Sequence, residues 1–129
     1  MQLLFESSEE FGFNKGLGII KGKVKKLPEN LNLKVPNISW QPLSYNYQSL
    51  QSDTVNKTIL KNHDFKKDLY FVHSYACYPE SNSSWLAITK YGNHEFCSVV
   101  KEKNLFGFQF HPEKSGLTGL KLLEGFLKE

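Results

Sequence analysis

The chain has 129 residues, of which 40% are hydrophobic and 22% are charged, and its formal net charge is +3. This composition is that of one globular domain or part of one. The sequence contains neither a basic block with interleaved aromatic residues nor an apolar run of transmembrane length, and Met1 is followed by glutamine rather than by a basic leader. We therefore expect a cytoplasmic protein with no nucleic-acid partner and no membrane partner.

Two cysteines, Cys77 and Cys97, are too few for a disulfide framework. We expect both to be buried, unreactive thiols in a reducing compartment. His63 and His94 have no partners at the spacing of metal ligands, so the sequence predicts no metal site.

The first third of the chain is expected to contain a helix and two extended segments. Residues 1–10 are typical of a helix already under way, which Gly12 would close. Because a helix at a first residue frays, this pattern suggests that further chain belongs upstream. Residues 16–28 read as a turn and an edge strand whose lysines prevent pairing with other chains. Residues 34–43 form a short extended segment.

The remaining elements alternate. Residues 69–79 are predicted to form one buried strand, and residues 85–91 and 96–101 form a hairpin around Gly92-Asn93. Residues 117–128 are predicted to form a helix. Its broad apolar face, expected to pack on the sheet, consists of Leu120, Leu123 and Leu127 beside Leu122 and Phe126. Together these elements predict one α/β domain over residues 1–129, with a mixed sheet flanked by helices and an inserted hairpin.

A motif at residues 104–116 carries the chemistry. Read as an extended strand, it points Phe106, Phe108 and Phe110 one way, and Gln109, His111 and Glu113 the other. Pro112 should end the strand at the sheet margin. A histidine held by a carboxylate is a prepared general base, because the carboxylate fixes the tautomer and leaves the second ring nitrogen free. The alternative is that His111 merely ends a strand and Glu113 caps the helix that follows.

Three segments together resemble the class I, or triad, glutamine amidotransferases, and among them the glutaminase subunits of imidazole glycerol phosphate synthase. They are residues 1–10, Phe71-Val72-His73-Ser74-Tyr75, and residues 108–116 with Gly119-Leu120-Lys121-Leu122-Leu123 behind them. The resemblance runs over the whole chain. It implies an amidotransferase fold. It also implies that the intact enzyme hydrolyses glutamine and needs no cofactor.

The resemblance also implies roles for individual residues. His111 would be the general base and Glu113 its orienting carboxylate, while Gln2, Ser74 and Tyr75 would bind the substrate glutamine.

Two further residues would face the partner subunit, which in this family is a barrel-type cyclase. Lys114 matches a position at the ammonia channel, and Trp40 matches the Trp of a Gly-Trp-Asn motif near the interface. Here that motif reads Ser39-Trp40-Gln41, and Ala76-Cys77 follows Tyr75 where aromatic or aliphatic residues are more usual. These departures leave the expected glutaminase chemistry unchanged and keep more than one partner and pathway open.

The nucleophilic cysteine of the family stands in a Gly-x-Cys-Leu-Gly-Met-Gln elbow, and this chain starts at the Met of that elbow. The resemblance therefore implies the C-terminal part of a glutaminase for histidine biosynthesis, inactive alone. Two alternatives stay open. One is a related subunit that supplies ammonia for amidination of a surface-glycan sugar, and the other is a non-catalytic remnant that binds a partner.

Overall fold

The computed structural model describes residues 1–29, 33–46 and 58–128. In these ranges the elements are, in chain order, η1 (Gln2–Leu4), β1 (Phe5–Ser8), β2 (Asn14–Lys15), β3 (Ile20–Lys26), β4 (Asn37–Pro42), β5 (Ser44–Tyr45), β6 (Asp68–His73), β7 (Tyr75–Pro79), η4 (Asn82–Ser84), β8 (Trp85–Tyr91), β9 (His94–Glu102), β10 (Leu105–Phe108), η5 (Pro112–Lys114) and α2 (Gly116–Phe126).

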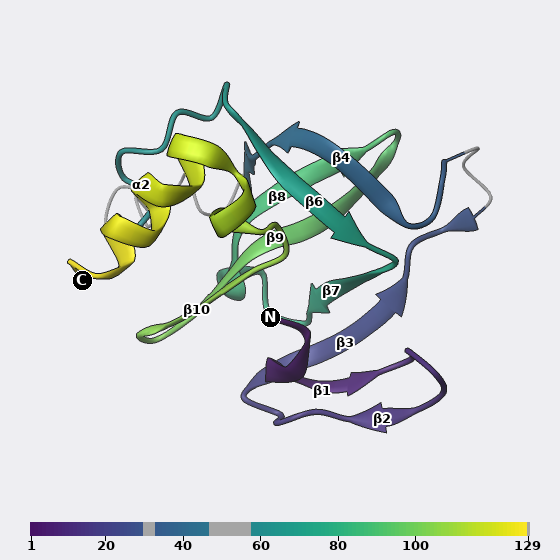
Figure 1. Cartoon of the computed structure of the whole chain (residues 1–129). Helices are drawn as coiled ribbons and strands as arrows, with labels where there is room; N and C mark the ends of the chain where they lie inside the picture. Colours follow the sequence, from purple (N-terminus) through teal and green to yellow (C-terminus); the bar gives the residue numbers. More distant parts are fainter. Residues whose placement is uncertain (30–32, 47–57, 129) are drawn as a thin grey trace.

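The strands form one large sheet and one small one. The large sheet has eight strands in the order β2-β1-β3-β7-β9-β8-β5, and β10 also pairs with β9. The pair β1 and β3 is parallel, whereas the other pairs in this sheet are antiparallel, so the sheet is mixed. Strands β4 and β6 form a separate antiparallel pair, visible beside the large sheet in Figure 1.

The core is built mainly from the inner faces of these strands. Its fully buried members include Leu69 and Phe71 of β6, Leu86 of β8 and Phe96 of β9. The rings of Phe71 and Phe96 meet edge to face with centroids 5.8 Å apart, an arrangement that aromatic pairs favour. The small sheet and the large sheet therefore share one apolar core.

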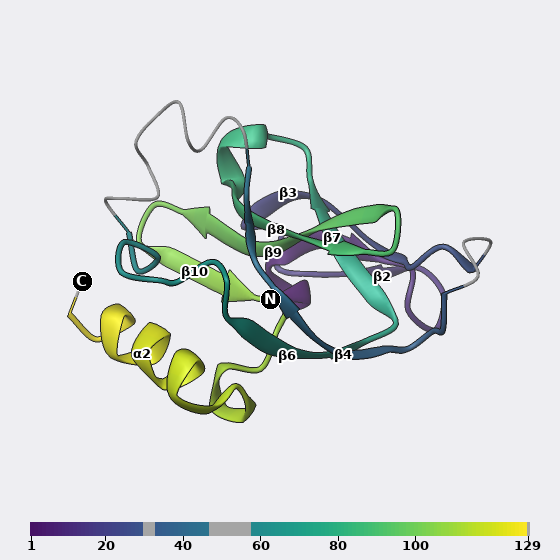
Figure 2. The same cartoon turned by 90° about the horizontal axis from the view of Figure 1, so that it is seen from above.

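Two sequence predictions about this region are confirmed. Strands β8 and β9 form an antiparallel hairpin that turns at Gly92 and Asn93, with Tyr91 opposite His94. Gly92 has a φ of 58°, which glycine adopts without steric cost. A helix also forms near the C-terminus, as expected, and both views place it beside β10 (Figures 1 and 2), where the rings of Phe106 and Phe126 lie 6.1 Å apart.

The predicted N-terminal helix over residues 1–10 is wrong. A single 3-10 turn at Gln2–Leu4 leads directly into strand β1. Phe5 is fully buried and pairs with Ile20 in the parallel ladder, so long-range pairing overrides the local helical pattern. The expectation that several helices flank the sheet is also not met in the described ranges, where α2 is the one α-helix.

The prediction of an edge strand at residues 16–28 is wrong as well. Strand β3 is internal, because it pairs with β1 on one side and with β7 on the other. Its burial alternates, with Ile20 and Val24 buried and the lysines exposed. The lysines therefore mark the solvent face of an internal strand.

The buried strand predicted for residues 69–79 is divided at Ser74. Strand β6 belongs to the small sheet and β7 to the large one. The carbonyl oxygen of Ser74 accepts a hydrogen bond from the backbone N–H of Leu27 at 2.8 Å. The chain therefore passes from one sheet to the other at this residue.

The buried face of the helix is narrower than the predicted one, although it includes Leu122 as expected. Gly119 and Leu122 are the buried residues of α2, whereas Leu120 and Leu127 are 54% and 82% exposed. The helix therefore contacts the rest of the described structure along a narrow stripe.

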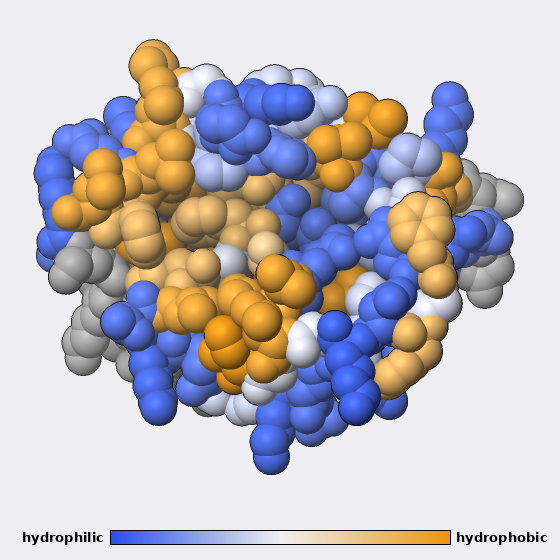
Figure 3. Space-filling model, turned by 60° about the horizontal axis from the view of Figure 1, so that its bottom comes forward, coloured by the Kyte–Doolittle hydropathy of each residue, from blue (hydrophilic) through white to orange (hydrophobic). Residues whose placement is uncertain are grey.

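Apolar side chains gather over a broad part of one face of the molecule (Figure 3). In the described ranges the exposed large apolar side chains lie mainly before β3 and in and just after α2: Leu3, Phe11, Phe13, Leu17, Ile19, Leu117, Leu120, Phe126 and Leu127. Apolar surface on this scale commonly marks contact with another part of a protein or with a partner. None of the helices in the described part of the chain is long and apolar enough to span a bilayer.

Candidate active site

The segment after β10 crosses from one sheet to the other. The ladder with β9 ends at Phe108, so the prediction that the strand continues to Pro112 is wrong. The N–H of Gln109 still donates to Ser98 of β9, but the N–H of His111 donates to Tyr70 of β6, each at 2.9 Å. The crossing places His111 at the margin of both sheets, beside the small one.

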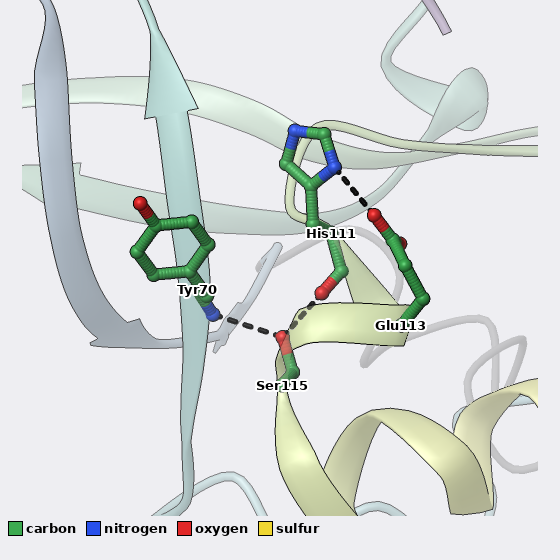
Figure 4. A network of polar contacts seen from close by, with 4 residues as sticks. All are labelled: Tyr70, His111, Glu113 and Ser115. Atoms are coloured by element: carbon green, nitrogen blue, oxygen red, sulfur yellow. Dashed lines mark hydrogen bonds and ion pairs between the residues drawn. The ribbon is translucent and has the colours of Figure 1, made fainter.

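His111 and Glu113 form a close pair. The His111 Nδ1 atom lies 2.8 Å from Glu113 Oε1. A carboxylate can only accept a hydrogen bond, so Nδ1 carries the proton and donates it. This hydrogen bond from His111 is the main cause that lowers the pKa of the Glu113 carboxyl. The other ring nitrogen points away from Glu113 (Figure 4).

The route to this pair differs from the expected one. Residues 112–114 form the 3-10 turn η5 rather than extended chain, and the turn brings the two side chains together. The alternative role of Glu113 as a helix cap is not what the geometry gives, since its carboxylate is engaged by the imidazole.

Ser115 anchors the segment that carries the pair. Its hydroxyl accepts a hydrogen bond from the N–H of Tyr70 at 2.9 Å and donates one to the carbonyl oxygen of His111 at 2.6 Å (Figure 4). The residue is 3% exposed. The sequence indicated no such role for Ser115, because a serine before a helix is normally an N-cap. In the structure its side chain makes no cap hydrogen bond.

Replacing Ser115 by alanine is expected to lower the free energy of unfolding by about 1–3 kcal/mol, since the N–H of Tyr70 would lose its acceptor. Urea unfolding followed by circular dichroism measures the loss. Ser83→Ala is a matched control, because Ser83 is exposed and its hydroxyl pairs with that of Ser81, its one side-chain partner in the part of the chain that the structure describes; we expect a change within about 0.5 kcal/mol. Equal stability of the Ser115 variant and the control would contradict this assignment.

The three residues expected to bind substrate lie close together. The Gln2 amide nitrogen donates to the carbonyl oxygen of Tyr75 at 3.2 Å, although residues 2 and 75 are far apart in sequence. Ser74 is half-buried at the crossing from β6 to β7. In the described part of the structure, no hydrogen bond links this group directly to the pair formed by His111 and Glu113.

The two residues expected to face a partner lie on the His111 side. Trp40 is 54% exposed on β4, and its ring centroid lies 5.6 Å from that of Tyr70. The Tyr70 ring in turn lies 6.5 Å from the imidazole of His111. Lys114 is exposed at the end of η5. The half-buried ring of Tyr70 thus lies between exposed Trp40 and the imidazole, and Lys114 is exposed in the turn that follows His111.

The family described as "Glutamine amidotransferase class-I" matches residues 1–129. The chain belongs to this family of glutamine amidotransferases. This result confirms the resemblance drawn from the three segments.

Its relatives include subunits of one enzyme. The chain is 46% identical over 129 residues to "Imidazole glycerol phosphate synthase subunit HisH" of Aquifex aeolicus, covering 100% of this chain and 57% of that protein. It is 40% identical over 128 residues to the subunit of the same name from Prochlorococcus marinus subsp. pastoris, covering 99% of this chain and 58% of that protein. The amidotransferase chain therefore spans less than two thirds of the length of these relatives.

Both cysteines of the amidotransferase chain are free and fully buried. They lie opposite each other on β7 and β9. Burial raises the pKa of the Cys77 thiol to about 12 and raises that of Cys97 well above its usual range. Because the thiolate is the reactive form, neither cysteine is a suitable nucleophile. The expectation of buried thiols is confirmed.

Neither thiol is expected to react with iodoacetamide at pH 7.5 while the chain is folded, because both are buried and protonated. Intact-mass spectrometry after brief exposure should give the unmodified mass, and two additions should appear in urea. Modification of Cys77 or Cys97 in the native state, at the rate of an exposed thiol, would contradict the burial.

Proposed function

We propose that the chain is the part of a glutaminase that carries the general base and its orienting carboxylate. In this proposal the assembled enzyme hydrolyses glutamine to glutamate and ammonia. The observation that carries it is the contact of 2.8 Å between His111 Nδ1 and Glu113 Oε1 in a chain of the class I glutamine amidotransferase family.

The geometry suits a proton shuttle. With Nδ1 held by Glu113, the Nε2 atom of His111 keeps a lone pair that can accept a proton. The two side chains are 39% and 56% exposed, so the contact between them contributes little to stability. Its value lies in fixing the tautomer and the orientation of the imidazole.

The reaction proceeds in two covalent steps. His111 first takes the proton of a cysteine thiol. The resulting thiolate attacks the side-chain amide carbon of glutamine, and the imidazolium of His111 donates that proton to the departing ammonia, which leaves a thioester. The neutral imidazole then takes a proton from water, the hydroxide attacks the thioester, and glutamate leaves as the thiolate returns. Because Cys77 and Cys97 are buried, the proposal requires a thiol from a segment outside the 129 residues.

The acceptor of the ammonia is proposed from the relatives, whose printed name describes a subunit of imidazole glycerol phosphate synthase. We propose that a barrel-type cyclase subunit receives the ammonia in histidine biosynthesis. Exposed Trp40, whose ring lies beside Tyr70, and exposed Lys114, in the turn after His111, would line the contact with the cyclase. Aromatic residues are enriched in interfaces.

A second candidate is a subunit that binds a synthase without catalysis. The burial of both thiols favours it, as does the exposed apolar surface. Binding of the 129-residue chain to a cyclase subunit, measured by calorimetry, would support this candidate only if no catalytic thiol is encoded with the chain.

The experiment that tests the proposal starts from the DNA upstream of the Met1 codon. If in-frame codons supply the cysteine elbow, the extended protein is expressed and its release of glutamate from glutamine is measured with and without a cyclase subunit. We expect turnover by the extended protein and none by the 129-residue chain. An extended protein that remains inactive with the cyclase, or ammonia release by the short chain that is abolished in His111→Ala, would overturn the proposal.

A further inference from the structure

His73 lies at the end of β6, where the chain crosses from the small sheet to the large one. The residue is 7% exposed, and both ring nitrogens have partners. Nδ1 lies 2.9 Å from the carbonyl oxygen of Tyr75, and Nε2 lies 3.0 Å from the side-chain nitrogen of Asn37 on β4. The imidazole therefore bridges the two sheets.

The partners determine which tautomer is present. A carbonyl oxygen only accepts, so Nδ1 of His73 carries the hydrogen and donates it to Tyr75. Nε2 then holds a lone pair, which accepts from the amide of Asn37. The orientation of that amide is fixed in turn, because its oxygen accepts a hydrogen bond from the Ser39 hydroxyl at 2.6 Å. Burial lowers the pKa of His73 to about 4, in agreement with a neutral ring.

The carbonyl oxygen of Tyr75 has two donors. The amide of Gln2 donates to it at 3.2 Å, in addition to the imidazole of His73. The preceding carbonyl, that of Ser74, is held by the N–H of Leu27. The backbone of the Ser74–Tyr75 segment thus accepts hydrogen bonds from Gln2, His73 and Leu27. The imidazole of His73 and the amide of Gln2 share one acceptor, the carbonyl oxygen of Tyr75.

These contacts exclude a second catalytic base. His73 has no free lone pair, since one nitrogen donates and the other accepts. We propose that His73 is a positioning residue of the glutamine site, which clamps the Tyr75 carbonyl onto Gln2 and holds the Ser74–Tyr75 backbone in place. The inference rests on the proposed function, because it takes Gln2, Ser74 and Tyr75 as the residues that bind glutamine.

Two substitutions distinguish the two hydrogen bonds of the His73 ring, the one to Tyr75 and the one from Asn37. The amide nitrogen of an asparagine side chain stands near the position of Nδ1, so His73→Asn keeps a donor to Tyr75. The longer His73→Gln reaches the position of Nε2 and keeps the contact with Asn37, but it loses the donor to Tyr75.

The first measurement uses the 129-residue chain in solution. A long-range proton–nitrogen NMR spectrum at pH 7 should show His73 with its hydrogen on Nδ1. The side-chain amide signals of Gln2 should move in His73→Gln and stay near their wild-type positions in His73→Asn. The other tautomer, or Gln2 signals that do not move in His73→Gln, would overturn the clamp.

The second measurement uses the thiol-containing enzyme. His73→Gln should raise the KM for glutamine about tenfold, the effect of one lost hydrogen bond, with a smaller change in kcat, and His73→Asn should restore most of the loss. If the wild-type enzyme turns over glutamine and the His73→Gln variant has the same KM, the inference about His73 is refuted and the proposed function is not. A wild-type enzyme with no turnover would refute the proposed function and, with it, the assignment of the clamp to glutamine, whatever the NMR result.

Discussion

Replacing His111 by alanine is expected to lower kcat/KM for glutamine hydrolysis about 100- to 10,000-fold in the thiol-containing protein, the usual contribution of a general acid–base. The physical reason is that His111 is the imidazole held in one tautomer by a carboxylate at the site. Without it, neither the ammonia nor the attacking water has a proton carrier. A coupled assay for glutamate measures the loss.

A matched control for this experiment is His94→Ala. His94 is also a histidine with a side-chain partner, since its Nε2 lies 2.7 Å from the hydroxyl oxygen of Tyr78. It lies on β9, and its hydrogen bond and its ring contact in the described structure are both with Tyr78, which is not assigned to the glutamine site. We therefore expect turnover within about threefold of wild type. Equal losses in both variants would show that the His111 substitution acts through the fold rather than through proton transfer.

Acidification is expected to destabilise the chain between about pH 6.5 and pH 4. Burial lowers the pKa of His73 from 6.5 to about 4. The unfolded chain therefore takes up a proton at this residue as the pH falls below 6.5, while the folded chain stays neutral there until about pH 4. The stabilisation is complete above pH 6.5 and is lost as the pH falls, by about 3 kcal/mol in total. Urea midpoints between pH 7.5 and pH 4.5 measure it.

The variant His73→Gln isolates this contribution. The pKa values of His63 and His94 are also lowered by burial, so they add pH dependence of the same sign in every variant. The lowered pKa of Glu113 adds a further loss at more acidic pH. Removing the imidazole of His73 should therefore flatten the profile above pH 4 without abolishing it. A variant with the wild-type slope in this range would contradict the burial of a neutral His73.

Local sequence signals were sufficient where an element depends on its own residues. Gly92-Asn93 between two apolar runs predicted the hairpin, because glycine relieves the steric cost of the turn. Apolar residues at helical spacing predicted the C-terminal helix. The spacing of His111 and Glu113 around a proline was enough to predict that the imidazole and the carboxylate meet, although the 3-10 turn that joins them was not foreseen.

Tertiary structure decided what depends on distant partners. The helical pattern of residues 1–10 gave way to a strand, because burying Phe5 beside Ile20 in a ladder outweighs a local preference. Alternating lysines occur both on edge strands and on the solvent face of internal strands, so the sequence of β3 could not distinguish the two positions. Likewise, residues 69–79 read as one buried run, since nothing local reveals a change of sheet.

The site divides in the same way. By itself the sequence determined that an imidazole and a carboxylate would pair, since side chains two positions apart can meet through local geometry alone. Only the tertiary structure revealed that Ser115 ties His111 to β6 and that Asn37, His73, Tyr75 and Gln2 form one chain of hydrogen bonds. These contacts join residues as far as 73 positions apart, and a hydrogen bond between distant residues leaves no periodicity in the sequence from which it could be predicted.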